Sequence, residues 1–273
     1  MPASGTMFAL TMRMKKIVLI AFLLTGFTAH SLEGQKVLRS IQNEAFKPGE
    51  KLYFQLHYGF ISAGEATLEV LPETKKVGQR ECYHMIGTGR STGAFDWFFK
   101  VRDRYESVVD KHAIIPWVFI RSVREGSYKK NQNVSFDHYE DSAKSETATI
   151  AIPEYTQDLI SAFYYARTID FNNAKEGDIF PITGYLDDEI LSLNLKYLGK
   201  EKIKSKVGMI RCLKFRPMLA EGRVFKEDED MTIWVSDDKN RIPVRVQTDI
   251  LVGSIKMDLV KYENLANELA LTK

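Results

Sequence analysis

The serine at position 91 lies in the sequence Gly-Arg-Ser-Thr-Gly (89–93), which matches the Gly-x-Ser-x-Gly pattern of hydrolase nucleophiles. In that motif a strained turn between a strand and a helix presents the serine oxygen above a parallel sheet, and an acid and then a histidine follow along the chain. After Ser91 the chain contains only His112 and His138, both soon after it. Because strands do not alternate with helices in this sequence, the motif also fits a glycine-rich turn before an aromatic helix. A hydrolase is therefore kept as an alternative interpretation.

Ligands for a metal ion or a cofactor are the next chemistry to consider. The chain holds five histidines and two cysteines, with no Cys-x-x-Cys or His-x-x-x-His pair. Acidic clusters at 187–189, 227–230 and 237–238 lack the ligand spacing of a calcium loop. No glycine-rich loop ends in Lys-Ser or Lys-Thr, as nucleotide-binding loops do. We therefore expect no metal and no cofactor, and we take the chain to be non-enzymatic.

Aromatic side chains gather in two segments, residues 93–101 (GAFDWFFKV) and 156–167 (TQDLISAFYYAR). They are more numerous than one helix face buries, which indicates that some line a pocket or contact a partner. Our candidates for ligand binding are Trp97, Phe98, Phe163, Tyr164 and Arg167. The structural alternative is core packing, with an ion pair between Arg167 and Asp96 or Asp103 that fixes the helices on a sheet.

Both aromatic segments are predicted to be helices, and the second carries the clearer signals. Thr156 can act as its N-cap, and Asp158 would lie in the first turn, where a negative charge suits the helix dipole. An apolar stripe recurs at helical spacing, at Leu159, Ala162, Phe163 and Ala166. We expect this stripe to pack into the core.

The rest of the chain shows the two-residue alternation of β-strands. Apolar residues occupy every second position in residues 52–58, 66–70, 191–197, 231–235, 244–246 and 255–259. Glycine, proline, aspartate and asparagine separate these runs, for example at 47–49, 62–64 and 237–240. Each such strand would place one face on a core and one toward water, as antiparallel sheets do. The chain is therefore predicted to be mainly β.

Two parts of the chain resemble each other weakly. The matched segments are 48–50 with 176–178, 77–82 with 207–212, and 109–118 with 236–245. We expect a single domain of residues 32–273, with pseudo-repeated halves at about 46–152 and 172–262 joined by a helix at 156–167. The two meanders would merge into one curved antiparallel sheet or open half-barrel, with two short helices packed on its concave face. Chance is the rival explanation, because any all-β chain repeats strands and turns.

The N-terminal segment is typical of a signal peptide. A basic stretch (13–16) precedes an apolar run (17–27), and small residues fit cleavage after Ser31. The apolar run is too short to span a bilayer, and no cysteine follows it to carry a lipid anchor. The natural translation start is expected at Met14, because the sequence from Met14 onward (MKKIVLIAFLL) is a complete opening of a signal peptide by itself. We predict a signal peptide over residues 1–31, export to the periplasm and no transmembrane span in the mature chain.

The mature chain would be almost neutral. Residues 1–31 hold three basic residues and no acidic one, so 38 basic and 36 acidic residues become 35 and 36. A chain of this charge lacks the basic surface that nucleic-acid binding needs. Cys82 and Cys212 would lie in an oxidising compartment. There they could form a disulfide or remain as two separate buried thiols, and the sequence does not decide between these alternatives.

Three groups of residues carry a family resemblance. They are PGEKLY (48–53) with Gly59 and Gly64, QDLISAFYYAR (157–167), and WVSDD (234–238) leading into IPV (242–244). With these features the chain resembles the DUF3108 family of exported bacterial proteins of unknown function, from about residue 46 to residue 262. The resemblance implies export and a mainly β fold, and it supplies no catalytic residues.

We therefore interpret the chain as a periplasmic, non-enzymatic protein that binds an apolar ligand or an envelope protein on a curled sheet. One alternative is a structural or interaction module with a filled core. The other is an envelope hydrolase that uses Ser91 with His112 or His138, or an acidic pair.

Overall fold

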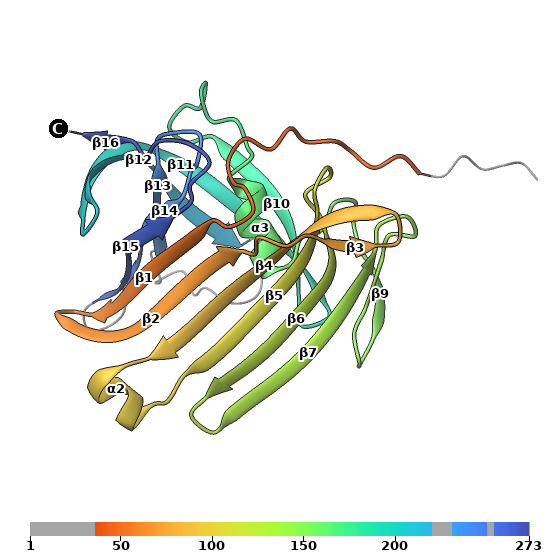
Figure 1. Cartoon of the computed structure of the whole chain (residues 1–273), viewed down its shortest axis with the longest axis horizontal. Coiled ribbons are helices and arrows are strands. Elements are labelled where there is room, and N and C mark those ends of the chain that lie inside the picture. The colour runs from red at the N-terminus through yellow and green to blue at the C-terminus, as the bar shows by residue number, and fades with distance from the viewer. Residues whose placement is uncertain (1–35, 220–230, 250–253, 273) are drawn as a thin grey trace, which may run out of the picture. The chain divides into compact units, whose positions relative to one another are not determined.

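The computed structural model describes residues 36–219, 231–249 and 254–272, so the predicted signal peptide lies outside the described residues. The chain divides into two compact units, Met1–Val37 and Leu38–Lys273. All of the described helices and strands belong to the second unit (Figure 1).

Strands dominate this unit and follow one another as two meanders. The first meander consists of β1 (Lys51–Tyr58), β2 (Ile61–Val70), β3 (Lys75–Val77), β4 (Arg80–Ser91), β5 (Arg102–Asp110), β6 (Pro116–Glu125), β7 (Tyr128–Asp137), β8 (Ser142–Lys144) and β9 (Thr149–Ala151). The second consists of β10 (Ile179–Leu186), β11 (Glu189–Ser205), β12 (Gly208–Leu219), β13 (Met231–Ser236), β14 (Pro243–Asp249), β15 (Ser254–Glu263) and β16 (Leu271–Thr272).

The two meanders merge into one sheet because β15 pairs antiparallel with β1. The strand order is β10-β11-β12-β13-β14-β15-β1-β2-β4-β5-β6-β7-β8-β9, with β3 on β4 and β16 on β12. The sheet is curved and open (Figure 1). The predicted fold class, a mainly β chain with a curved antiparallel sheet and two short helices, is confirmed.

The longer helix, α3 (Leu159–Ala166), begins later than predicted. Its N-cap is Asp158, whose side chain accepts the N–H groups of Ile160 and Ser161, while the Ser161 hydroxyl accepts the N–H of Asp158. This reciprocal pair is a capping box. The prediction of Thr156 as N-cap is wrong, because its hydroxyl donates to a carbonyl of the preceding turn.

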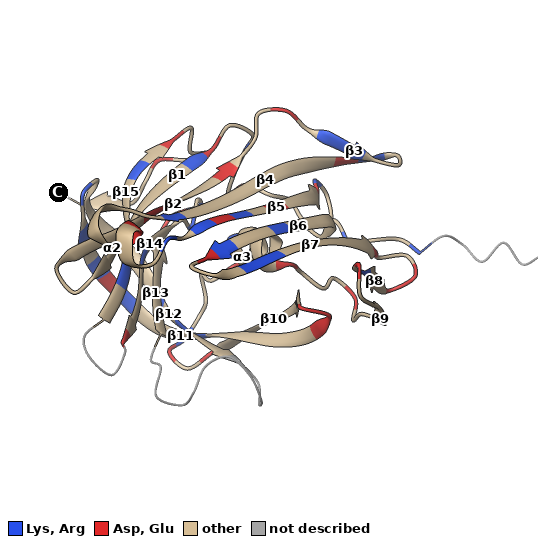
Figure 2. Cartoon of the chain, turned by 90° about the horizontal axis from the view of Figure 1, so that it is seen from below, with Lys and Arg blue, Asp and Glu red and all other residues tan. Residues whose placement is uncertain are grey.

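The two helices occupy different places. α3 contacts β4, β5 and β10 and lies within the curve of the sheet (Figure 2). α2 (Gly93–Phe98) forms the connection from β4 to β5, contacts β2 and buries none of its residues. We expected both helices on the concave face, whereas α2 is held at the strand ends, where Asp96 accepts hydrogen bonds from Ser91 and Arg102.

Side chains connect the β10 end of the curved sheet to β6 and β7 of the first meander. Asp187, in the turn between β10 and β11, pairs with Arg121 of β6 and Lys130 of β7. The aromatic rings of Phe136 and Tyr185 meet edge-on at 5.4 Å. These contacts hold β10 opposite β6 and β7 and so define the space in which α3 lies.

The starts of the two meanders share local geometry. The N–H of Gly49 donates to the carbonyl of Val70, and the N–H of Gly177 donates to the carbonyl of Tyr197. Both glycines have a positive φ, 86° and 97°, a backbone conformation that residues with a Cβ rarely adopt. The residues that follow, Glu50 and Asp178, accept from Val70 and Tyr197 in turn.

The turns toward the ends of the meanders match as well. Asp110 donates its N–H to the Ile115 carbonyl, as Ser236 does to the Ile242 carbonyl. The strand partner of Asp110 is Cys82, and that of Ser236 is Cys212. The two cysteines are free and buried, which corresponds to the alternative of two separate thiols. A duplication would leave such pairs of equivalent contacts, and the internal repeat stays a prediction.

Candidate functional site

The apolar stripe of α3 faces a cavity. Leu159, Ala162, Phe163 and Ala166 all line a space of about 350 Å³. The expectation that this stripe packs into the core is met in part: Ala162 is buried in a core cluster with Ile182 and Leu195, whereas Leu159 is 42% exposed. The residues that α3 does bury in the main core include Ile160 and Tyr164, on another side of the helix.

The opposite wall of the cavity comes from the concave face of β10 to β13. Its side chains alternate along each strand, as one face of a sheet requires: Ile182, Gly184 and Leu186; Leu191, Leu193 and Leu195; Phe215 and Pro217; Met231, Ile233 and Val235. Almost all of them are hydrocarbon. The sequence showed this alternation in β11 and β13, from which we expected one face of each strand to lie on the inside of the curled sheet.

The position of α3 explains why the space is left unfilled. The helix approaches the first meander closely at Gly87 of β4. A Cβ at this position would lie only 2.8 Å from Cδ1 of Ile160, so the approach requires glycine there. On the other side, Gln157 pairs with β10 through its backbone, donating to Thr183 and accepting from Tyr185. The helix thus packs on both meanders, and over the second it covers the sheet only in part: Ala162 packs with Ile182 and Leu195, while Leu159 stays exposed.

Arg167, which ends α3, has a structural role. Its guanidinium donates to both carboxylate oxygens of Glu50 at 2.6 and 2.8 Å, and to the carbonyls of Ala45 and Asn240. Both charged side chains are buried, at 2% and 0% exposure. The predicted partners Asp96 and Asp103 are wrong, because the carboxylate that pairs with Arg167 belongs to Glu50, the residue just before β1.

The other sequence candidates are dispersed. Phe163 lines the cavity, while Tyr164 is fully buried in the core against Phe46, with ring centroids 4.9 Å apart. Trp97 and Phe98 lie on α2, pack edge-on against each other and are 83% and 76% exposed. The structure therefore brings Phe163 and Arg167 together at the cavity, and places Trp97 and Phe98 on the surface away from its lining.

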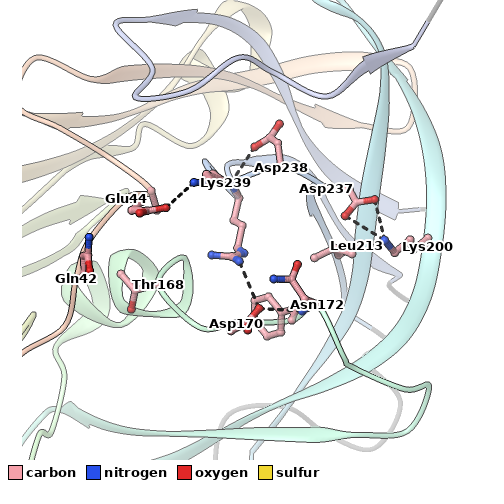
Figure 3. A pocket seen from close by; sticks show the side chains of 13 residues that line it. Gln42, Glu44, Thr168, Asp170, Asn172, Lys200, Leu213, Asp237, Asp238 and Lys239 are labelled. Atoms are coloured by element: carbon pink, nitrogen blue, oxygen red, sulfur yellow. Dashed lines mark hydrogen bonds and ion pairs between the residues drawn. The ribbon is translucent and has the colours of Figure 1, made fainter.

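A second cavity, of about 440 Å³, is polar and lies at the turn between β13 and β14 (Figure 3). Ion pairs cross it: Lys239 contacts Glu44 at 2.7 Å, and Lys200 contacts Asp237 at 3.0 Å. Thr168, Asn172 and Gln42 add neutral polar groups to its wall.

Phe171 and Arg241 line both cavities. The Arg241 guanidinium donates to the carbonyl of Arg167 at 2.9 Å, lies 5.7 Å from the Phe171 ring and 4.0 Å from an oxygen of Asp170. Burial lowers the pKa of Arg241 from its usual value, against the raising effect of Asp170. The sequence analysis missed both residues, and the only signal was their position beside the aromatic helix and the Ile-Pro turn.

Ser91 stands at the end of β4 in a hydrogen-bonded turn. Its hydroxyl donates to Asp96 at 2.6 Å and accepts the N–H of Val101. Hydrogen bonds from Arg102 and Ser91 lower the pKa of Asp96 to about 2. The partner of the Ser91 hydroxyl is therefore the Asp96 carboxylate, which also binds Arg102, and not an imidazole. The Nε2 atom of His138 is hydrogen-bonded elsewhere, to the carbonyl of Pro116.

Within the described ranges, no group of three or more His, Cys, Asp or Glu side chains is arranged to hold a metal ion. In the same residues, no helix is long and apolar enough to cross a membrane.

The fold and the cavity define a class of protein, an open antiparallel sheet curled around one helix with an apolar space between them. The chain belongs to the family described as protein of unknown function (DUF3108), whose model matches residues 53–260. This confirms the resemblance seen in the sequence motifs. No curated protein matches the chain.

Comparison with solved structures gives the following likenesses. A β-barrel-like protein of the DUF1849 family from Brucella abortus is similar with a TM-score of 0.51 and 10% identity, over 83% of this chain and 98% of that one. A hypothetical protein from Chlamydia trachomatis is similar with a TM-score of 0.37 and 6% identity, over 83% of this chain and 92% of that one. The first of these likenesses supports the fold alone.

Proposed function

We propose that this protein is an exported, non-enzymatic binding protein that holds an apolar ligand between α3 and the concave face of β10 to β13. The observation that carries the proposal is the cavity of about 350 Å³, which has hydrocarbon walls on both sides. Small-molecule pockets in proteins span about 300–1,000 Å³. A smaller cavity, of about 150 Å³ with leucine, isoleucine and phenylalanine walls, stays dry and binds benzene.

Energetics favour occupation of this space by an apolar molecule. The lining residues Leu191, Leu193 and Ile233 are only partly buried by the protein itself. Burial of apolar surface contributes about 25 cal/mol per Å², so a hydrocarbon chain that covers these side chains gains free energy on both partners. The described residues bury Ile182, Leu195 and Phe215 on this face and leave Leu191, Leu193 and Ile233 partly exposed, which favours a ligand over a filled core.

The proposed location is the periplasm. The support is the N-terminal sequence, in which a basic segment, an apolar run of eleven residues (17–27) and small residues before position 32 follow in the order of a signal peptide. The near-neutral charge of residues 32–273 agrees with a binding partner that is neither nucleic acid nor strongly charged.

A partner protein is the second candidate, and the aromatic surface of α2 favours it. Trp97 and Phe98 are exposed and do not line the cavity. In this interpretation they are contact residues for an envelope protein, while the cavity keeps its own ligand.

Binding of N-phenyl-1-naphthylamine, a neutral dye whose fluorescence rises in apolar surroundings, tests the proposal. The wild-type protein is expected to bind one dye molecule per chain. Leu193→Gln places an amide in the cavity wall and is expected to weaken dye binding by about tenfold. The matched control is Ser192→Gln on the same strand, where the side chain is exposed and binding is expected to be unchanged. Absence of saturable binding, or equal affinities of the two variants, contradicts the proposal.

A further inference from the structure

The apolar cavity and the polar cavity meet at one charged side chain. Arg241 and Phe171 belong to the linings of both. A molecule with its hydrocarbon part along Leu193 and Ile233 therefore has a guanidinium at one end of its site, with a polar chamber beyond it.

The hydrogen-bonding capacity of Arg241 is only partly used by the described residues. A guanidinium carries five N–H donors, and one of them reaches the carbonyl of Arg167 at 2.9 Å. The nearest carboxylate, Asp170, stands at 4.0 Å, and its side chain is 68% exposed. The Arg241 side chain itself is only 17% exposed, so water screens it less than a surface arginine.

The other arginine of the apolar lining uses four of its five N–H donors within the protein and is paired with a buried carboxylate. Arg167 donates to Glu50, Ala45 and Asn240. Arg241 is thus the cation of this lining that is placed to receive an anionic ligand group.

The acidic groups around the polar cavity are each engaged. Glu44 is paired with Lys239, and Asp237 with Lys200. Asp238 accepts the N–H groups of Asn240 and Ala270. The remaining acid, Asp170, accepts the N–H of Asn172 and faces solvent. Arg241 therefore has one ion-pair partner among the described residues, the exposed Asp170 carboxylate at 4.0 Å, and none of their carboxylates lies within hydrogen-bond distance of it.

We propose that the ligand is a single-chain amphiphile, with its hydrocarbon chain between α3 and β10 to β13 and a carboxylate or phosphate group at Arg241, facing the polar cavity. This inference rests on the proposed binding of an apolar ligand. Arginine suits both anions, because its planar fork donates two parallel hydrogen bonds to either group.

Three probes with the same twelve-carbon chain test the head group: 1-dodecanol, dodecanoate and dodecyl phosphate, each measured by displacement of N-phenyl-1-naphthylamine from the full chain. Wild-type protein is expected to bind at least one of the two anions about tenfold more tightly than the alcohol. The anion that binds more tightly identifies the natural head group as a carboxylate or a phosphate.

Arg241→Gln is expected to remove the preference, so that the anions bind about as weakly as 1-dodecanol, whose affinity does not change. The matched control is Lys239→Gln on the same turn. Lys239 lines the polar cavity, pairs with Glu44 and does not line the apolar one, so its loss is expected to leave all three affinities within about twofold.

The outcomes separate the two proposals. Equal affinities of the wild-type protein for all three probes overturn the role of Arg241 and leave the apolar site intact. The same conclusion follows if Arg241→Gln binds dodecanol normally and keeps its preference for the anion. Failure of the wild-type protein to bind the dye or any probe refutes the apolar site itself.

Discussion

Arg167 and Glu50 form a buried ion pair that joins the end of α3 to the start of β1, across 117 positions of the chain. The two nitrogen–oxygen distances are 2.6 and 2.8 Å. Because this pair fixes the orientation of the helix end, it decides which stripe of α3 faces the cavity. The same guanidinium binds the Asn240 carbonyl at 2.8 Å and so also connects α3 to the turn between β13 and β14.

Replacement of Arg167 by methionine is expected to lower the free energy of unfolding by about 3–5 kcal/mol, because it leaves the Glu50 carboxylate buried without a cation. Urea denaturation measures this loss. In the double variant Arg167→Met/Glu50→Gln much of the stability should return. Arg102→Met, which breaks the exposed pair with Asp96, is the control and should cost far less. A loss no larger than that of the control would show that the buried pair does not position α3.

The N-cap of α3 makes stability depend on pH. Burial raises the pKa of Asp158 from 3.8 to about 6, although hydrogen bonds from Ser107 and the helix N–H groups lower it. Between these values the folded state keeps a proton that the unfolded state has released. The contribution of Asp158 to stability is therefore complete below about pH 4 and falls as the pH rises to about 6, by up to about 3 kcal/mol.

This titration is isolated by a comparison with Asp158→Asn, which keeps an oxygen for the N–H groups of α3 and has no proton to lose. Urea unfolding of both proteins from about pH 4 to about pH 7 gives the difference in their free energies of unfolding. The wild type should lose stability relative to the variant as the pH rises. A flat difference would mean that Asp158 has the same pKa in the folded and unfolded states.

The two thiols are expected to be inert in the native protein. Burial raises the pKa of Cys82 and of Cys212 to about 12, so the reactive thiolate is scarce at neutral pH. Iodoacetamide at neutral pH should add no label to the folded chain and two labels in strong urea, counted by intact mass. Fast labelling of either residue without denaturant would contradict its buried position.

The aromatic residues of α2 should be dispensable for the cavity. Trp97→Ser and Phe98→Ser remove exposed rings, so the melting temperature and the affinity for N-phenyl-1-naphthylamine are expected to stay close to those of the wild type. Substitution of Phe163, which lines the cavity, by serine should weaken the binding of the dye. If the α2 variants lose dye binding and Phe163→Ser retains it, the ligand lies at α2 and not at α3.

Periodicity in the sequence was enough to find six of the strands, β1, β2, β11, β13, β14 and β15, and the apolar stripe of α3, because these depend on local alternation. Periodicity did not show whether Leu159 and Phe163 contact other side chains or line a cavity, because apolar side chains suit both environments. That difference arises from the distance between α3 and the second meander, which depends on contacts such as Gly87 with Ile160.

The partners of charged residues were harder to predict. The sequence pointed to Arg167 as a central polar group, yet its partner Glu50 is 117 positions away in the chain, so no local pattern connects the two. Arg241 was missed because its contacts, with Arg167 and Phe171, are also distant in the chain. It lies in an Ile-Pro turn with no motif of its own, and its importance follows from the two cavities that meet there.

Native mass spectrometry of the protein purified from its own cell envelope tests the central claim most directly. We predict that the wild-type chain carries one apolar small molecule, and that Ala166→Trp, which fills the cavity from α3, carries none. A wild-type chain that is free of any adduct and takes up none on incubation with 1-dodecanol or dodecanoate would contradict the account. An identical adduct on Ala166→Trp would contradict it equally.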